Sequence, residues 1–226
     1  MSDMWSSLIP LIIGSAVVPI QIVITVLLLR SKAGKITAIA WIAGMTLFRL
    51  AQGLVFGLVF RSSDASGSTS DGAGTVVSVL LLLVAILFFI GAAKAFLHHP
   101  DEDAPPPRWM AMIDGITPGK AFLLGMGLMA IGAKFWVFTL GAIAVIGEAD
   151  MGQVGSILAF LVFVALAESI MLGVVGVAYA LPDRADAMLD RISGFLTAYN
   201  RVIVITLGLI FGAWFTLKAL NGLGVI

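Results

Sequence analysis

Apolar residues in this chain gather into long runs instead of alternating with polar residues. Six runs are each about 20 residues or longer, which is the length of helix that crosses a bilayer core of about 30 Å. Lipid offers no hydrogen-bonding partner to an unpaired backbone group, so each run is predicted to be a helix. The predicted spans are 8–29, 36–60, 75–97, 121–146, 154–181 and 202–220.

Two of these runs contain nearly the same polar interruption. Leu50-Ala51-Gln52 lies in the second run and Leu166-Ala167-Glu168 in the fifth, and the similarity continues past both triplets. An internal duplication of this kind is typical of secondary transporters. We therefore predict a first three-helix repeat in residues 1–98, a cytoplasmic linker in 99–119 and a second three-helix repeat in 120–226.

The distribution of Lys and Arg predicts how the two repeats are oriented. Basic residues concentrate in the connectors after spans one, three and five, whereas the connectors after spans two and four hold only Arg61. The positive-inside rule makes the first group cytoplasmic, which leaves both termini outside. Three spans in each half then give the halves opposite orientations. The predicted fold is an all-α integral membrane protein built from two inverted three-helix repeats.

The connector between spans five and six has its own pattern. Apolar positions between 183 and 198 recur at helical spacing, with charged positions between them. A helix of this kind either lies in the plane of the lipid headgroups or caps the cytoplasmic end of the bundle. The pattern fits both arrangements.

Composition agrees with a membrane protein and excludes other classes. The chain is 60% hydrophobic and 12% charged, and a soluble domain carries roughly twice that charged fraction. The net charge is zero, which gives no reason to expect a nucleic-acid partner. No catalytic motif is present, so neither an enzyme activity nor a cofactor is predicted. His98 and His99 precede an acidic stretch, but adjacent histidines in a flexible loop rarely chelate one ion, and no metal site is predicted.

Polar side chains at membrane depth are the candidates for function. Arg49, Gln52, Lys134 and Glu168 fall well inside predicted spans, and Gln21 lies nearer the end of its span. A charge at the bilayer centre costs about 3 kcal/mol on insertion scales, so these groups are expected to pair or to face a wet interior. We expect Arg49 or Lys134 to pair with Glu168. One interpretation is a substrate or proton site, and the alternative is a static ion pair that fixes helix register.

Interruptions of the predicted helices point to the same region. Pro19 removes a backbone hydrogen bond in span one, and Gly132 weakens span four just before Lys134. Paired interruptions in corresponding helices indicate the binding site of a transporter, although an ordinary proline kink remains the alternative for Pro19. The candidate substrate-binding or ion-binding residues are Pro19, Gln21, Arg49, Gln52, Lys134 and Glu168.

Three segments carry a resemblance to a known family: VVPI at 17–20, AKFWVFTLGA at 133–142 and LDRISGFL at 189–196. Through these segments the chain resembles the Gap/Sap family of glycolipid- and sulfolipid-addressing membrane proteins, within the wider lysine-exporter superfamily. The resemblance covers nearly the whole chain. The resemblance implies six helices in two inverted repeats and the export or positioning of envelope lipids. Gly132-Ala133-Lys134 departs from the family's Asn-Pro-Lys motif and keeps only the Lys, which leaves the substrate open.

The sequence thus predicts a multi-pass protein of the bacterial inner membrane that exports or positions an envelope lipid or another amphiphile by alternating access. Arg49 and Lys134 would neutralise an anionic group of the substrate. Glu168 would be the counter-ion or proton-coupling group, with Gln52 as its uncharged counterpart. The alternatives are an exporter of a small polar solute such as an amino acid, and a non-transporting scaffold for lipid-synthesis enzymes. Membrane lipids are the expected partners, and glycine pairs spaced for close helix contact would permit a homodimer.

Overall fold

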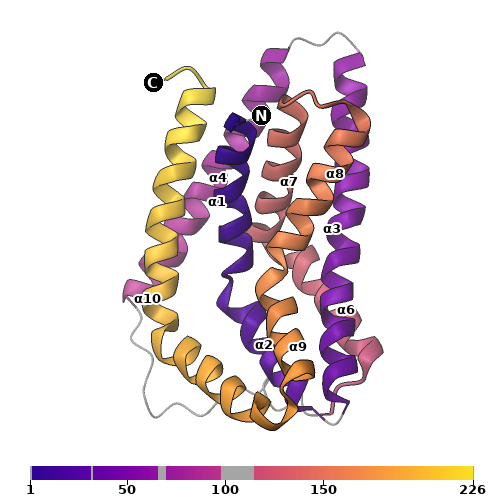
Figure 1. Ribbon diagram of the computed structural model, residues 1–226. Helices are drawn as coiled ribbons and strands as arrows, with labels where there is room; N and C mark the ends of the chain where they lie inside the picture. The colour runs from indigo at the N-terminus through magenta and orange to yellow at the C-terminus, as the bar shows by residue number, and fades with distance from the viewer. Residues whose placement is uncertain (1, 32, 66–69, 98–114, 226) are drawn as a thin grey trace.

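The computed structural model describes residues 2–31, 33–65, 70–97 and 115–225, and every regular element in these ranges is a helix (Figure 1). The first half of the chain contributes α1 (Ser2–Ala16), α2 (Pro19–Arg30), α3 (Gly34–Ala65) and α4 (Ser70–Leu97). The second half contributes α6 (Pro118–Ile131), α7 (Ala133–Glu148), α8 (Gly152–Ala167), α9 (Ser169–Ala180) and α10 (Pro182–Gly222).

Three predicted spans are pairs of helices joined at a bend. The helices α1 and α2 meet at 46°, α6 and α7 at 73°, and α8 and α9 at 57°. In Figure 1, α1, α7 and α8 occupy the upper part of the bundle, and α2, α6 and α9 occupy the lower part. Each bend therefore lies in the interior of the bundle and not at one of its ends.

Length and composition support between two and five membrane spans in the described residues. The segments Gly34–Gly57 of α3 and Arg201–Gly222 of α10 are each long and apolar enough to cross a bilayer alone, and each bent pair would add one span. The predicted third span lies in α4, where the apolar segment found is the shorter Leu81–Leu97. Six spans and their inverted arrangement remain predictions.

Two predicted boundaries are wrong. The second predicted span ends at residue 60 and the third begins at 75, but α3 continues to Ala65 and α4 already begins at Ser70. The helix expected over 183–198 is present, but it is the first part of α10 and continues without a break into the sixth predicted span. Proline is absent between position 182 and the end of the helix, and Gly194 alone does not stop helical hydrogen bonding.

The first part of α10 runs across one end of the bundle before the helix turns along it (Figure 1). Leu189 is buried there against Ile22, Val26 and Val174, which belong to α2 and α9. Phe195, on the same segment, is 58% exposed. The segment therefore packs onto the bundle through Leu189 and the partly buried Ile192, and it presents Phe195 outward.

Glycines bring the helix backbones into close contact. A methyl group on Gly44 of α3 would lie 2.1 Å from the Phe122 carbonyl oxygen of α6, and one on Gly125 of α6 would lie 2.3 Å from the Trp41 carbonyl oxygen of α3. Gly208 of α10 similarly packs against α4. Small residues permit this approach, so at least these glycines serve packing within the chain.

Candidate functional site

The three bends have different local causes. Pro19 follows the extended residue Val18 at the start of α2, because proline has no N–H to continue the helical hydrogen bonds of α1. Gly132 ends α6 and precedes α7 with extended backbone angles. These two breaks confirm the predicted interruptions. The third break lies at Glu168, between α8 and α9, where neither glycine nor proline occurs. Sequence inspection missed it for that reason.

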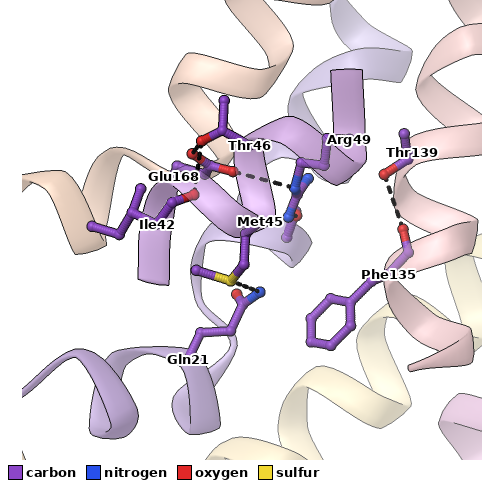
Figure 2. A network of polar contacts seen from close by, with 9 residues as sticks. Gln21, Ile42, Met45, Thr46, Arg49, Phe135, Thr139 and Glu168 are labelled. Atoms are coloured by element: carbon purple, nitrogen blue, oxygen red, sulfur yellow. Dashed lines mark hydrogen bonds and ion pairs between the residues drawn. The ribbon is translucent and has the colours of Figure 1, made fainter. Parts of the chain in front are cut away.

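An ion pair lies at this third break. The Arg49 Nε atom, from the unbroken helix α3, lies 3.6 Å from Glu168 Oε1 (Figure 2). The exposed fractions of the two side chains are 0% and 2%. Arg49 also donates from Nη2 to Ser15 Oγ, 2.7 Å away in α1. The site therefore joins α3 to α1 and to the break between α8 and α9.

Thr46 holds the other oxygen of the carboxyl group. Its Oγ1 lies 2.5 Å from Glu168 Oε2 and 2.9 Å from the Ile42 carbonyl oxygen (Figure 2). A hydroxyl group has a single hydrogen to donate. If Glu168 is ionised, Thr46 donates to the carboxylate. If Glu168 carries a proton, Glu168 donates to Thr46 and Thr46 donates to Ile42. The same geometry thus accommodates both protonation states.

Hydrogen bonding at the pair is incomplete. Within the described residues, Arg49 Nε and Nη1, Glu168 Oε1 and both amide atoms of Gln52 are buried without a hydrogen-bond partner. A buried polar group without a partner costs about 1–3 kcal/mol, and more if it is charged. A folded protein rarely leaves so many such atoms together unless another molecule or another conformation satisfies them.

The predicted site residues are only partly brought together. Gln21 lies in the first turn of α2, directly after the Pro19 break, and its Nε2 contacts Met45 Sδ at 3.5 Å (Figure 2). Gln52 lies one turn beyond Arg49 on α3 and is 4% exposed. The break gives Gln21 a central place, although the sequence analysis placed it nearer the end of its span.

Lys134 lies apart from the ion pair. Its Nζ sits 5.2 Å from the ring centre of Phe135, and among the described residues it has no ion pair with Glu168. Of the two predicted partners of Glu168, Arg49 is therefore the one found. The adjacent Trp136 donates from Nε1 to the Ala130 carbonyl oxygen at 2.9 Å, which satisfies one of the free carbonyls at the end of α6.

Two residues that position the pair were not nominated from the sequence. Ser15 and Thr46 are uncharged and common in membrane helices, so neither stands out. Thr46 lies one helical turn before Arg49, so the two side chains share a face of the helix. This spacing could have identified Thr46 from the sequence. His98 and His99 lie outside the described residues. Among the described residues no cluster of three or more metal-ligating side chains occurs.

Comparison with known proteins gives one match. The family model described as Sap, sulfolipid-1-addressing protein, matches residues 8–221. A search of curated proteins and a search of solved structures each found no match.

Proposed function

The chain belongs to the family of Sap, sulfolipid-1-addressing proteins, and from that premise we propose that it moves an anionic envelope lipid or a similar amphiphile by alternating access. Its apolar helices make it a membrane protein, and its family relates it to lipid addressing. We further propose which residues act on the lipid while it crosses the membrane.

The observation that carries the proposal is the buried Arg49–Glu168 pair at a helix break. Broken helices expose backbone groups inside a membrane protein, and transporters use such breaks to build binding sites and hinges. Two further breaks, at Pro19 and Gly132, occur in the helices that begin the two halves of the chain. A bundle with three interrupted helices can change shape more easily than one of continuous helices.

The proposed mechanism is an exchange of partners at Arg49. An anionic headgroup approaches the guanidinium and replaces Glu168, which is held at 3.6 Å and is not hydrogen-bonded to Arg49. Glu168 then takes up a proton and keeps its contact with Thr46. Gln52 offers both a donor and an acceptor beside the headgroup, and Lys134 supplies a second positive charge near the Gly132 break. When the headgroup leaves, Glu168 releases its proton to water and returns to Arg49 as the carboxylate.

One observation favours a second candidate, a non-transporting scaffold for lipid-synthesis enzymes. Arg49 and Glu168 are closed off from solvent, as expected of a static pair that holds the helices in register. In that case the charges would serve folding alone.

Reconstituted vesicles test the proposal. A sulfated glycolipid with a fluorescent acyl chain is added, and its movement between leaflets is followed by chemical bleaching from outside. Glu168→Gln keeps the shape of the side chain and removes its charge, so protein-dependent movement should stop. Glu148→Gln makes the same change at an exposed residue at the end of α7 and should keep wild-type movement.

Full lipid movement by Glu168→Gln would overturn the coupling role of Glu168. Efflux of a labelled amino acid, measured in the same vesicles, checks the small-solute alternative. Amino-acid efflux without lipid movement would replace the lipid proposal.

A further inference from the structure

The buried face of α3 carries a line of side chains that extends beyond the ion pair, and all of them except Met45 have a nitrogen or oxygen atom. Its members recur at intervals of three or four residues, and their exposed fractions are between 0% and 4%: Thr37, Trp41, Met45, Arg49 and Gln52. At 1.5 Å per residue, Thr37 and Gln52 are about 22 Å apart along the helix. The line therefore extends from near the start of α3 past the Arg49–Glu168 pair.

Most of the polar atoms in this line have no partner. Within the part of the chain that the structure describes, Thr37 Oγ1 and Trp41 Nε1 are buried without a hydrogen bond, as are atoms of Arg49 and Gln52. Four threonine hydroxyls in the described helices bond the carbonyl four residues earlier: those of Thr25, Thr46, Thr139 and Thr216. The tryptophan at 136 likewise has a partner for its N–H. Thr37 and Trp41 therefore differ from these residues of the same types.

The chemistry of these atoms restricts what could satisfy them. Trp Nε1 and the Arg guanidinium can only donate, while the Thr hydroxyl and the Gln amide can also donate. A group with several acceptor oxygens and a negative charge matches this set. Sulfate esters and phosphates have that chemistry, whereas a neutral sugar or an ammonium group does not match Arg49.

We propose that this face of α3 is the route of an anionic oxygen-rich headgroup, which enters at Thr37 and Trp41 and passes to Arg49. The inference rests on the proposed function and extends it by two residues, Thr37 and Trp41. Trp41 and Arg49 are eight residues, or about 12 Å, apart along the helix, so one sulfate or phosphate group contacts them in succession. Gln21 contacts Met45, between these two positions, and contributes a further buried amide to the route.

Lipid movement in the reconstituted vesicles tests the route with Thr37→Val, which removes one hydroxyl and keeps the shape. Loss of one hydrogen bond to the moving headgroup should slow lipid movement roughly fivefold. Thermal stability should not fall, because the hydroxyl has no partner to lose. Thr139→Val is the matched control, since Thr139 is equally buried but already bonds the Phe135 carbonyl; its lipid movement should stay at the wild-type rate. Trp41→Phe is the second variant and should also slow movement.

Wild-type rates in both Thr37→Val and Trp41→Phe would overturn the route. If Glu168→Gln still stopped lipid movement in that case, the proposed function would stand and only the route would fail. If Glu168→Gln were also fully active, the proposed function itself would fail.

Binding to lipid nanodiscs distinguishes the headgroups. Thermal stability is compared in discs that contain sulfated galactosylceramide, phosphatidic acid or uncharged galactosylceramide. Greater stabilisation of the wild type than of Trp41→Phe by either anionic lipid supports the route, and the stronger of the two identifies the preferred headgroup. Equal stabilisation by the uncharged lipid would contradict it.

Discussion

A double variant of Arg49 and Glu168 can separate the effect of the ion pair on stability from its effect on lipid movement. The Arg49 Nε atom and Glu168 Oε1 are 3.6 Å apart and fully enclosed. With an effective dielectric constant of about 20, two unit charges at that distance attract by about 4.6 kcal/mol. Removing one partner of a buried pair strands the other charge and typically costs about 3–5 kcal/mol, a similar size. Glu168→Gln and Arg49→Met should each lose stability by that amount.

The double variant should behave differently. Replacing both charges leaves no stranded ion, and such replacements are often neutral. We therefore expect Arg49→Met with Glu168→Gln to regain most of the lost stability, with a coupling free energy of at least about 2 kcal/mol. Lipid movement should nevertheless stay absent, because neither the anion-binding cation nor the ionisable carboxyl group remains.

Unfolding in bicelles, titrated with a denaturing detergent, measures the stability of all four proteins, and the vesicle assay measures lipid movement. If the double variant moves lipid at the wild-type rate, the pair only holds the helices in register and the scaffold function gains support. If the stability loss of the double variant equals the sum of the two single losses, the charges are not coupled. The attraction calculated from their separation would then be wrong.

Two further predictions concern packing and topology. Gly44→Ala should cost about 1–3 kcal/mol of stability in the same unfolding titration, because the added methyl group would collide with the Phe122 carbonyl. Gly57→Ala is the control and should not change stability, because Gly57 has open space around it. Because the chain has no cysteine, a single one can report its side of the membrane. Val225→Cys should react with an impermeant maleimide added outside intact cells, and Gly194→Cys only after the cells are opened; the reverse result would invert the predicted orientation.

Several features of the fold could be predicted from the sequence, since they depend on local chemistry. Pro19 and Gly132 break their helices as expected, because a missing N–H and a missing side chain act at the residue that carries them. The break at Glu168 has no such local cause. It coincides with the contacts of Glu168 with Thr46 and Arg49 of α3, and the residues from 166 to 169 do not reveal these partners by themselves.

At the candidate site, too, some features follow from local chemistry and others depend on how the helices are placed. The cost of burying charge predicts that Arg49 and Glu168 avoid lipid, and the pairing follows because few opposite charges lie at that depth. Charge alone could not decide between Arg49 and Lys134 as the partner of Glu168. The decision comes from helix position, since α3 contacts α9 and places Arg49 at the break, while Lys134 begins α7 beside Phe135.

The reciprocal glycine contact between α3 and α6 decides where this bundle can bend. The carbonyl of Phe122 packs closely against Gly44, and the carbonyl of Trp41 packs closely against Gly125. Each helix thus contacts the backbone of the other at a glycine. Two helices interlocked in this way cannot slide without a collision, and they must move as one rigid body. We therefore expect any opening on that side of the protein to take place at the bend at Gly132, between α6 and α7. In the proposed transport cycle, a disulfide or other crosslink across that joint should stop lipid movement, whereas a crosslink between α3 and α6 should leave it unchanged.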